Sequence, residues 1–140
     1  MIKPIVIWPD RRLHDRSTEV FVSDFEKLGI KELIQDMWDT MYAAGGVGLA
    51  AIQIGVPLRV CVLDTGKPYK PYVLINPTIT SSADLATLNE GCLSVPGFVE
   101  QLSRFTKISV SYFDENGVGQ SGVFEGMAAQ AVQHLSLIHI

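Results

Sequence analysis

The chain has 140 residues, of which 47% are apolar and 19% are charged, and its formal net charge is −4. This composition excludes a disordered chain, and the length suits one domain with a substantial core. The sequence contains no basic stripe, so direct binding of nucleic acid is not expected. No apolar run approaches the roughly 20 residues of a membrane span, so no membrane partner is expected either.

The cysteine content and the N-terminal segment indicate the compartment. Cys61 and Cys92 are too few for a disulfide framework, which is typical of a reducing environment. Residues 1–8 are apolar, but a proline and charged residues follow at once and no small-residue cleavage site is present. This segment therefore does not have the pattern of a signal peptide, and we expect a cytoplasmic protein.

The clearest predicted element is a helix over residues 24–44. Ser23 or Asp24 can cap its start, and Gly45 with Gly46 would end it. Before this helix we expect a lead-in segment at 4–8 and a charged loop in which His14 is a surface residue. The apolar residues of the helix recur at three- and four-residue spacing and form one face, which comprises Phe25, Leu28, Leu33, Ile34, Met37, Trp38, Met41 and Tyr42.

Most of the following chain predicts β-strands. Cys61 lies inside the first of them and is interpreted as a core residue. Asn76 and Pro77 are expected to close the second strand, and a polar loop is expected at 81–84. The predicted strands are 58–64, 72–75, 98–102 paired with 107–113, and 120–124 after a hairpin turn at 114–117. From Gly126 onward the alanine density favours a C-terminal helix, so the predicted class is α+β.

The sequence places the chemistry at residues 89–96. Cys92 follows a glycine, and Glu90 lies two positions before it. A deprotonated thiol can serve as a soft metal ligand or as a nucleophile, and the alternative is a buried small hydrophobic residue. A glycine-rich run ending at Gln53 lies upstream, and His134 lies downstream. A thiolate, an imidazole and a carboxamide that converge on one cleft would form a small metallohydrolase site.

The order of these segments resembles the peptide deformylase family, whose members remove the formyl group from the initiator methionine of new bacterial proteins. That family carries a G-x-G-L-A-A-x-Q run, an E-G-C-L-S run and an H-E-x-x-H helix. The first run matches residues 46–53 and the second matches residues 90–94, both without a mismatch. The resemblance extends from about Ile7 to His134. It implies antiparallel β-sheets with a long N-terminal helix and a C-terminal metal-site helix packed in their bend.

The resemblance also implies a metal and a set of site residues. In the family, one cysteine and two histidines hold a divalent metal, with water in the fourth position. Fe²⁺ is expected, and Zn²⁺, Ni²⁺ or Co²⁺ can replace it. Cys92 matches the thiolate ligand and His134 matches the first histidine. The side chain of Gln53 and the backbone N–H of Leu93 would stabilise the developing oxyanion, and Gly48 would bond the substrate backbone.

The family's pocket for the methionine side chain can be placed in the same way. Glu90 is expected to hold a partner such as Arg104 in a structural role. Gln130 departs from the usual aliphatic residue, so one wall of the pocket is expected to be more polar or more open. The implied partners are N-formylmethionyl peptides or nascent chains, and we expect a monomer. The pocket residues, which are equally compatible with plain core packing, are Val47, Leu88, Met127, Gln130 and Ala131.

The third motif ends after its first histidine. Leu135 stands at the position of the catalytic glutamate, and Ile138 stands at that of the second histidine. His139 is five residues after His134, so on a regular helix it points about 140° away and is a poor substitute. We therefore expect weak metal binding and very low or absent deformylase activity.

Residues 135–140 are interpreted as an atypical tail after a single domain at 1–134. Their sequence, Leu-Ser-Leu-Ile-His-Ile, is what one reading frame of a common sequencing adapter can encode, so one hypothesis is a clipped enzyme with reduced stability. A second is a natural degenerate relative that is kept as a non-catalytic peptide-binding domain. A third is a structural α+β domain whose motifs serve packing alone.

Overall fold

The computed structural model describes residues 1–138, and His139 and Ile140 lie outside the described residues. Its five-stranded sheet has the order β1-β2-β3-β4-β5, and all neighbouring strands are antiparallel. With two α-helices in the same residues, this sheet confirms the predicted α+β class. The elements are α1 (Ile30–Ala43), β1 (Gly48–Ala50), β2 (Val60–Leu63), β3 (Tyr72–Cys92), β4 (Val95–Phe113), β5 (Gly119–Glu125) and α2 (Gly126–Ile138).

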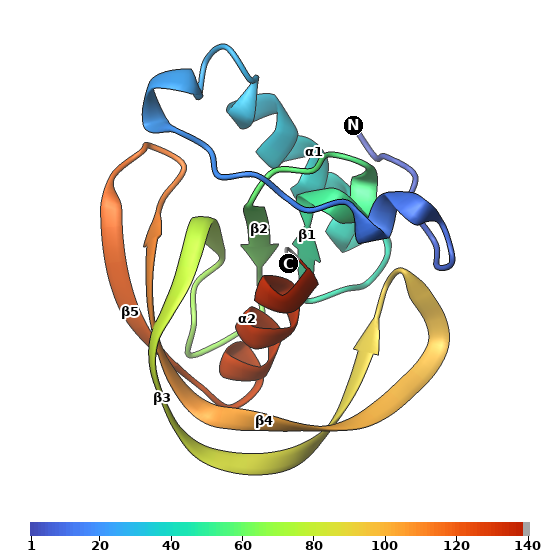
Figure 1. Ribbon diagram of the computed structural model, residues 1–140, viewed down its shortest axis with the longest axis vertical. Coiled ribbons are helices and arrows are strands. Elements are labelled where there is room, and N and C mark those ends of the chain that lie inside the picture. Colours follow the sequence, from blue (N-terminus) through green and yellow to red (C-terminus); the bar gives the residue numbers. More distant parts are fainter. Residues whose placement is uncertain (139–140) are drawn as a thin grey trace.

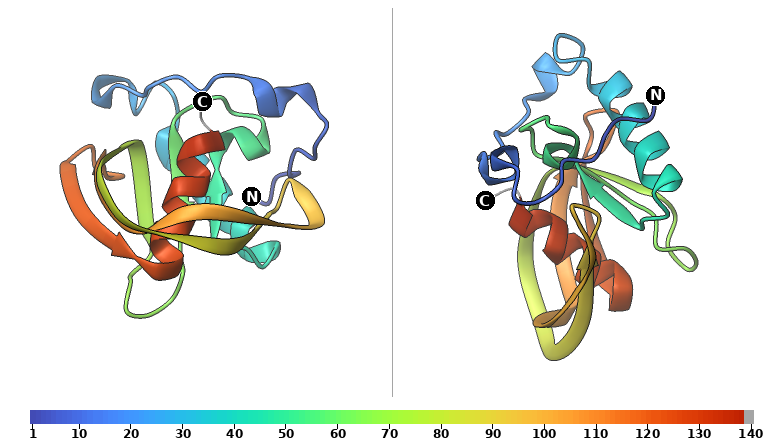
Figure 2. Two further views of the ribbon diagram at one scale, coloured as in Figure 1. Left: turned by 60° about the horizontal axis from the view of Figure 1, so that its bottom comes forward. Right: turned by 90° about the vertical axis from the view of Figure 1, so that its right-hand side faces the viewer.

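The two α-helices lie on opposite sides of the sheet. β3 and β4 are long curved strands, and α2 lies in the hollow of their bend (Figure 1). α1 lies across β1 and β2 on the other side (Figure 2). Alternate residues of β2 divide between these layers: Val60 and Val62 pack with α1, whereas Cys61 and Leu63 join the core beneath α2. Because both faces of β2 are covered, the strand is apolar throughout.

Two minor expectations hold in the structure. Cys61 is buried in the core, and burial raises the pKa of its thiol to about 12. His14 is exposed at the end of a short 3-10 helix. Among residues 1–138, no helix combines the length and the apolar character that crossing a membrane requires.

The start of the N-terminal helix was predicted wrongly. α1 begins at Ile30, because Gly29 has a left-handed backbone with φ of +64° and breaks the regular geometry before it. Residues 22–24 form a separate 3-10 turn, so neither Ser23 nor Asp24 caps α1. Phe25 follows this turn and packs against the same core as α1, which explains why its apolar side chain fits the spacing of the helix. The helix end agrees with the prediction, since α1 stops at Ala43 just before the two glycines.

Gly29→Ala is expected to lower the free energy of unfolding by about 1 kcal/mol, because an L side chain is strained in the left-handed region. A Cβ there would meet no atom within 4 Å, so the loss isolates the backbone term. Gly119→Ala is the control, since a Cβ at Gly119 makes only an ordinary 3.8 Å contact with Phe113. Urea denaturation of both variants measures the difference. A Gly29→Ala chain as stable as the parent would contradict the assignment.

The predicted breaks in the long strands were also wrong. β3 continues through Asn76 and through the expected loop at 81–84. Asn76 has φ of +52° at an irregularity in the β3–β4 register, and its side chain bonds both the N–H and the C=O of Val20. β4 is one strand that pairs with β3, so its two predicted halves do not pair with each other. Turn-forming residues here bend a strand rather than end it. The hairpin between β4 and β5 is where it was predicted.

Candidate active site

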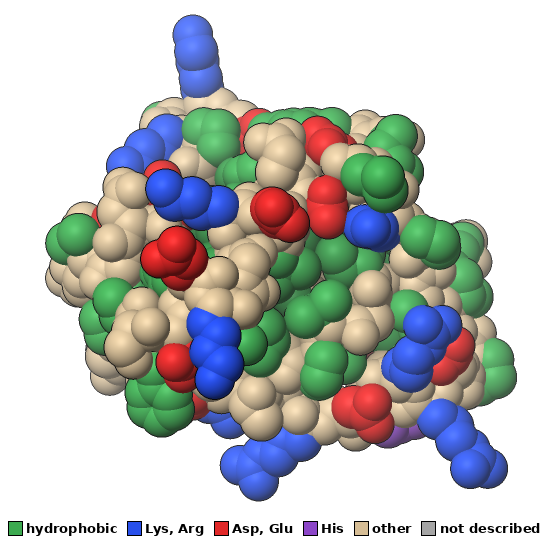
Figure 3. Space-filling view, turned by 90° about the horizontal axis from the view of Figure 1, so that it is seen from above, with side chains coloured by type: hydrophobic (Ala, Val, Ile, Leu, Met, Phe, Trp, Pro, Cys, Tyr) green, Lys and Arg blue, Asp and Glu red, His purple; other side chains and the backbone are tan. Residues whose placement is uncertain are grey.

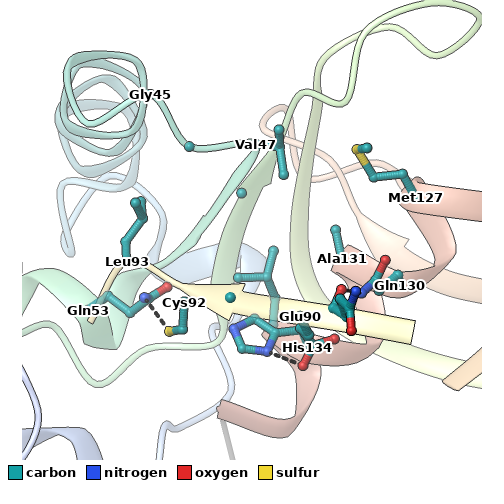
Figure 4. Close-up of a pocket in the computed structure, with 15 residues that line it drawn as sticks. Gly45, Val47, Gln53, Glu90, Cys92, Leu93, Met127, Gln130, Ala131 and His134 are labelled. Carbon is teal, nitrogen blue, oxygen red and sulfur yellow. Dashed lines mark hydrogen bonds and ion pairs between the residues drawn. The ribbon is translucent and has the colours of Figure 1, made fainter. Parts of the chain in front are cut away.

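A cavity of about 410 Å³ lies between β1, the turn that joins β3 to β4, and α2. Figure 4 shows Gln53, Cys92 and His134 along one side of it, with Val47 and Met127 above them in this view. Its lining residues are Gly45, Gly46, Val47, Gly48, Gln53, Asn89, Glu90, Gly91, Cys92, Leu93, Met127, Gln130, Ala131, His134 and Leu135. The glycine-rich run, the cysteine motif and the C-terminal helix therefore meet at one place.

Gln53 is buried, with 2% of its surface exposed, on the short 3-10 helix Ala51–Ile54. Its side-chain oxygen accepts a hydrogen bond from the Ala50 N–H at 2.9 Å. That contact determines the direction of the amide, because the NH₂ group must then face the opposite side. There it donates to Ser94 Oγ at 3.1 Å and to Cys92 Sγ at 3.5 Å. The carboxamide thus presents a fixed donor next to the thiol.

Cys92 is half-buried at the last position of β3, where a two-residue turn leads into β4. Burial raises the pKa of its thiol, but the neighbouring His134 imidazole and the backbone N–H groups of Ser94 and Val95 lower it by more, so the net pKa is below the ordinary value. The proximity of the two side chains also acts on His134. Burial lowers the pKa of its imidazole, and the interactions with Cys92 and Glu90 outweigh burial and raise it.

Glu90 connects the imidazole to a buried arginine. Its carboxylate lies 2.8 Å from His134 Nδ1 and accepts hydrogen bonds from Arg104 at 2.8 and 3.2 Å. The side chains of Glu90 and Arg104 are only 7% and 13% exposed. The expected pairing of Glu90 with Arg104 is therefore present. Because Nδ1 is engaged with the carboxylate, Nε2 is the ring nitrogen left to serve the cavity.

The residues expected for the methionine pocket lie along the other part of the cavity, with one exception. Val47 and Met127 are 43% and 59% exposed at its mouth, and Gln130 and Ala131 line it from α2. The Gln130 amide donates to the backbone oxygen of Asn89 at 2.7 Å, which the sequence did not predict. Leu88 does not line the cavity. Leu88 precedes Asn89 on β3 and pairs with Leu102 of β4. On this strand the lining of the cavity extends only from Asn89 to Cys92.

The residue at the family's glutamate position is part of the core. Leu135 is 2% exposed and packs in the cluster beneath α2, while also lining the cavity. A Cβ at Gly48 would come within 2.9 Å of its Cδ1 atom, so β1 and α2 approach closely here. Ser94, whose hydroxyl accepts the hydrogen bond from Gln53, was not predicted as a site residue. Its place as the last residue of the E-G-C-L-S run was the signal that could have identified it.

A fixed amide donor, a thiol and an imidazole around one cavity are the parts of a small metallohydrolase site. Comparison with known proteins identifies the group within that class. Residues 2–136 match the family described as polypeptide deformylase. Curated peptide deformylases from Brucella suis and Aquifex aeolicus are 41% and 44% identical, over 95% and 96% of this chain and 77% and 80% of their own lengths.

Solved structures agree with this result. A peptide deformylase from Legionella pneumophila superposes with a TM-score of 0.91 at 40% identity, covering 99% of this chain and 82% of its own. One from Synechococcus elongatus, in complex with actinonin, has a TM-score of 0.88 at 38% identity, covering 99% and 76%. The chain belongs to the polypeptide deformylase family, the hydrolases that remove the N-formyl group from newly made proteins.

Members of this family are metalloenzymes, and the donor atoms of this chain fit that role in part. A cysteine sulfur and an imidazole nitrogen are suitable ligands for Fe²⁺ or Zn²⁺. However, within residues 1–138 no three His, Cys, Asp or Glu side chains gather as a metal-binding group. Ile138 is an aliphatic residue without an atom that can bind a metal, and Leu135 has no carboxylate. The described residues therefore offer two candidate ligands at this cavity, whereas a catalytic zinc site usually has three protein ligands.

Proposed function

We propose that this cavity binds N-formylmethionyl peptides or nascent chains for removal of the N-formyl group. The observation that carries the proposal is the meeting of Cys92, His134 and Gln53 at one cavity. Cys92 and His134 would hold one divalent metal, Fe²⁺ by the family's preference, with Zn²⁺, Ni²⁺ or Co²⁺ as possible replacements. When bound, the metal supplies a water molecule whose pKa is lowered.

The remaining residues act on the substrate. The Gln53 amide is oriented by Ala50, and the N–H that lies 3.5 Å from the thiol would donate to a developing oxyanion instead, with the Leu93 N–H proposed as its partner. Gly48 would bond the substrate backbone, where a bulkier residue would meet Leu135. The methionine side chain would enter the part of the cavity lined by Val47, Met127, Gln130 and Ala131.

Turnover by this chain is proposed to be very low, because the third ligand and the catalytic carboxylate are replaced by Ile138 and Leu135. A catalytically inactive domain that binds formylated peptides is the second candidate, favoured by a cavity that persists without those two groups. The protein is proposed to be cytoplasmic and monomeric, with no nucleic-acid partner. On the face in Figure 3, basic and acidic side chains are interspersed and form no field of one sign.

Calorimetric titration with a formyl-Met tripeptide tests the binding site. The parent chain is expected to bind it, and a peptide with aspartate in place of methionine is expected to bind at least tenfold more weakly, because its charge would lose hydration in an apolar cavity. Ala131→Phe, which fills the cavity, is expected to abolish binding. Ala83→Phe on the exposed part of β3 is the control and should bind normally. Equal affinity for the two peptides would contradict the proposal.

Metal analysis and a deformylation assay on the same preparations test the catalytic part. We expect less than one metal ion per chain after dialysis and little or no turnover of the formyl-Met tripeptide. Full metal occupancy with rapid turnover would show that two protein ligands are sufficient. If the chain binds neither the peptide nor a metal and shows no turnover, the proposed function is contradicted and only the fold assignment remains.

A further inference from the structure

The residue before His134 makes contacts that the site described above does not use. Gln133 is only 6% exposed and does not line the active-site cavity. Its side-chain oxygen accepts a hydrogen bond from the Phe105 N–H at 2.9 Å. Its amide donates to the Phe105 C=O at 2.6 Å and to the Ala129 C=O at 2.9 Å. Both ends of one carboxamide are therefore bound to a single residue of β4.

This contact replaces a missing β-strand. The pairing of β5 with β4 ends at Lys107 opposite Glu125, and the chain then turns into α2. Phe105 lies two residues beyond that last pair, at the edge that β5 no longer covers. An antiparallel partner would satisfy the N–H and the C=O of the same residue, and the Gln133 carboxamide does so instead. This uncovered edge of β4 thereby binds α2 at a defined register.

A second connection to α2 runs through Glu90 of β3. Arg104 binds Glu90, and Glu90 binds His134. Gln133 is thus held directly by the backbone of β4, whereas His134 is held by Glu90 of β3, whose carboxylate is in turn bound by Arg104 of β4. Successive helical residues differ by about 100° in direction, so fixing Gln133 against β4 also fixes the direction of His134.

We propose that Gln133 is a positioning residue, which docks α2 on the free edge of β4 and so directs the His134 ring between Cys92 and Glu90. The inference rests on the proposed role of His134 in the site. Gln133 itself touches neither the cavity nor the thiol. Without its carboxamide, the ion pair of Glu90 and the apolar packing of α2 would remain, but the hydrogen bonds that define the register of α2 against β4 would be lost.

The test is hydrogen exchange by NMR on the full chain without metal, with Gln133→Met. Methionine keeps the length and burial of the side chain and removes its three hydrogen bonds. Exchange of the His134 Nδ1 proton with solvent is expected to accelerate at least about tenfold, because the local opening that exposes it becomes easier. The backbone amides of Ile108 and Val110 in β4 are expected to change less than about twofold.

Gln35→Met is the control, because it makes the same substitution at an exposed position of α1, where the Gln35 amide donates to Asp39 at 2.9 Å. It should leave the His134 proton unaffected. An unchanged His134 proton in Gln133→Met would overturn the proposal, and so would equal acceleration of Ile108, which indicates general destabilisation. If Gln133→Met does not fold, Gln133→Glu keeps the acceptor for the Phe105 N–H and permits the same comparison. No metal or turnover is measured, so failure of this inference is distinguishable from failure of the proposed function.

Discussion

Leu135→Glu combined with Ile138→His is expected to raise the rate of deformylation by roughly 10²- to 10⁴-fold, the usual contribution of a positioned general acid–base group. Leu135 already lines the cavity beside Cys92 and His134, so a carboxylate there would face the reacting group. A histidine at 138 lies four residues after His134 and shares its face of the helix, where it can serve as the third ligand. The assay is turnover of a formyl-Met tripeptide, with metal content measured on the same sample.

Two further variants separate the causes of this gain. Leu137→Glu with Ile138→His places the carboxylate on an exposed part of α2, 53% accessible to solvent, and is expected to gain metal without comparable turnover. Leu135→Glu by itself is expected to gain neither and to lose stability, because it places a charge at a position that is 2% exposed. If the double variant with Leu135→Glu gains neither metal nor turnover, the peptide-binding function is favoured over a clipped enzyme.

Glu90→Ala is expected to lower the free energy of unfolding by about 3–5 kcal/mol, because it leaves a buried arginine without its counter-charge. Arg104 is 13% exposed and donates two hydrogen bonds to this carboxylate. The substitution also removes the partner of His134 Nδ1. Urea denaturation followed by circular dichroism measures the loss, with the slope checked for unchanged two-state behaviour.

The control is Glu125→Ala, which breaks an ion pair between β5 and β4. Glu125 lies 3.7 Å from Lys107, and the two side chains are 63% and 53% exposed. An exposed pair of this kind contributes about 0–1 kcal/mol, so the control should be nearly as stable as the parent. If both substitutions cost the same, Glu90 is not a buried structural partner, and the connection from β4 to His134 loses its physical basis.

Local patterns predicted a good part of the molecule. The alanine-rich stretch after Gly126 is a helix, and the turn at 114–117 is a hairpin, because both depend on neighbouring residues. The E-G-C-L-S run indicated the family, and its cysteine, Cys92, lines the cavity as predicted. The expected partner of Glu90 was also correct, since Arg104 lies opposite Ala86 on the paired strand and its long side chain can reach the carboxylate.

The start of α1 and the course of β3 could not be predicted in this way. Gly29 looks like a weak point inside an amphipathic helix, yet its backbone is left-handed and the helix begins after it. Residues 81–84 are polar and mostly typical of a loop, yet they pair with β4. In both cases contacts with distant parts of the chain override the local preference of the backbone.

The sequence by itself determined the family and the order of the carboxamide, thiol and imidazole along the chain. It also determined that leucine stands at 135 and isoleucine at 138, because these are properties of the side chains themselves. Only the tertiary structure decided that Glu90 would also bind His134, that Leu88 would lie outside the cavity, and that Gln133 would bond the free edge of β4 at Phe105. These outcomes depend on strand curvature and on where β5 ends, which contacts between distant segments set.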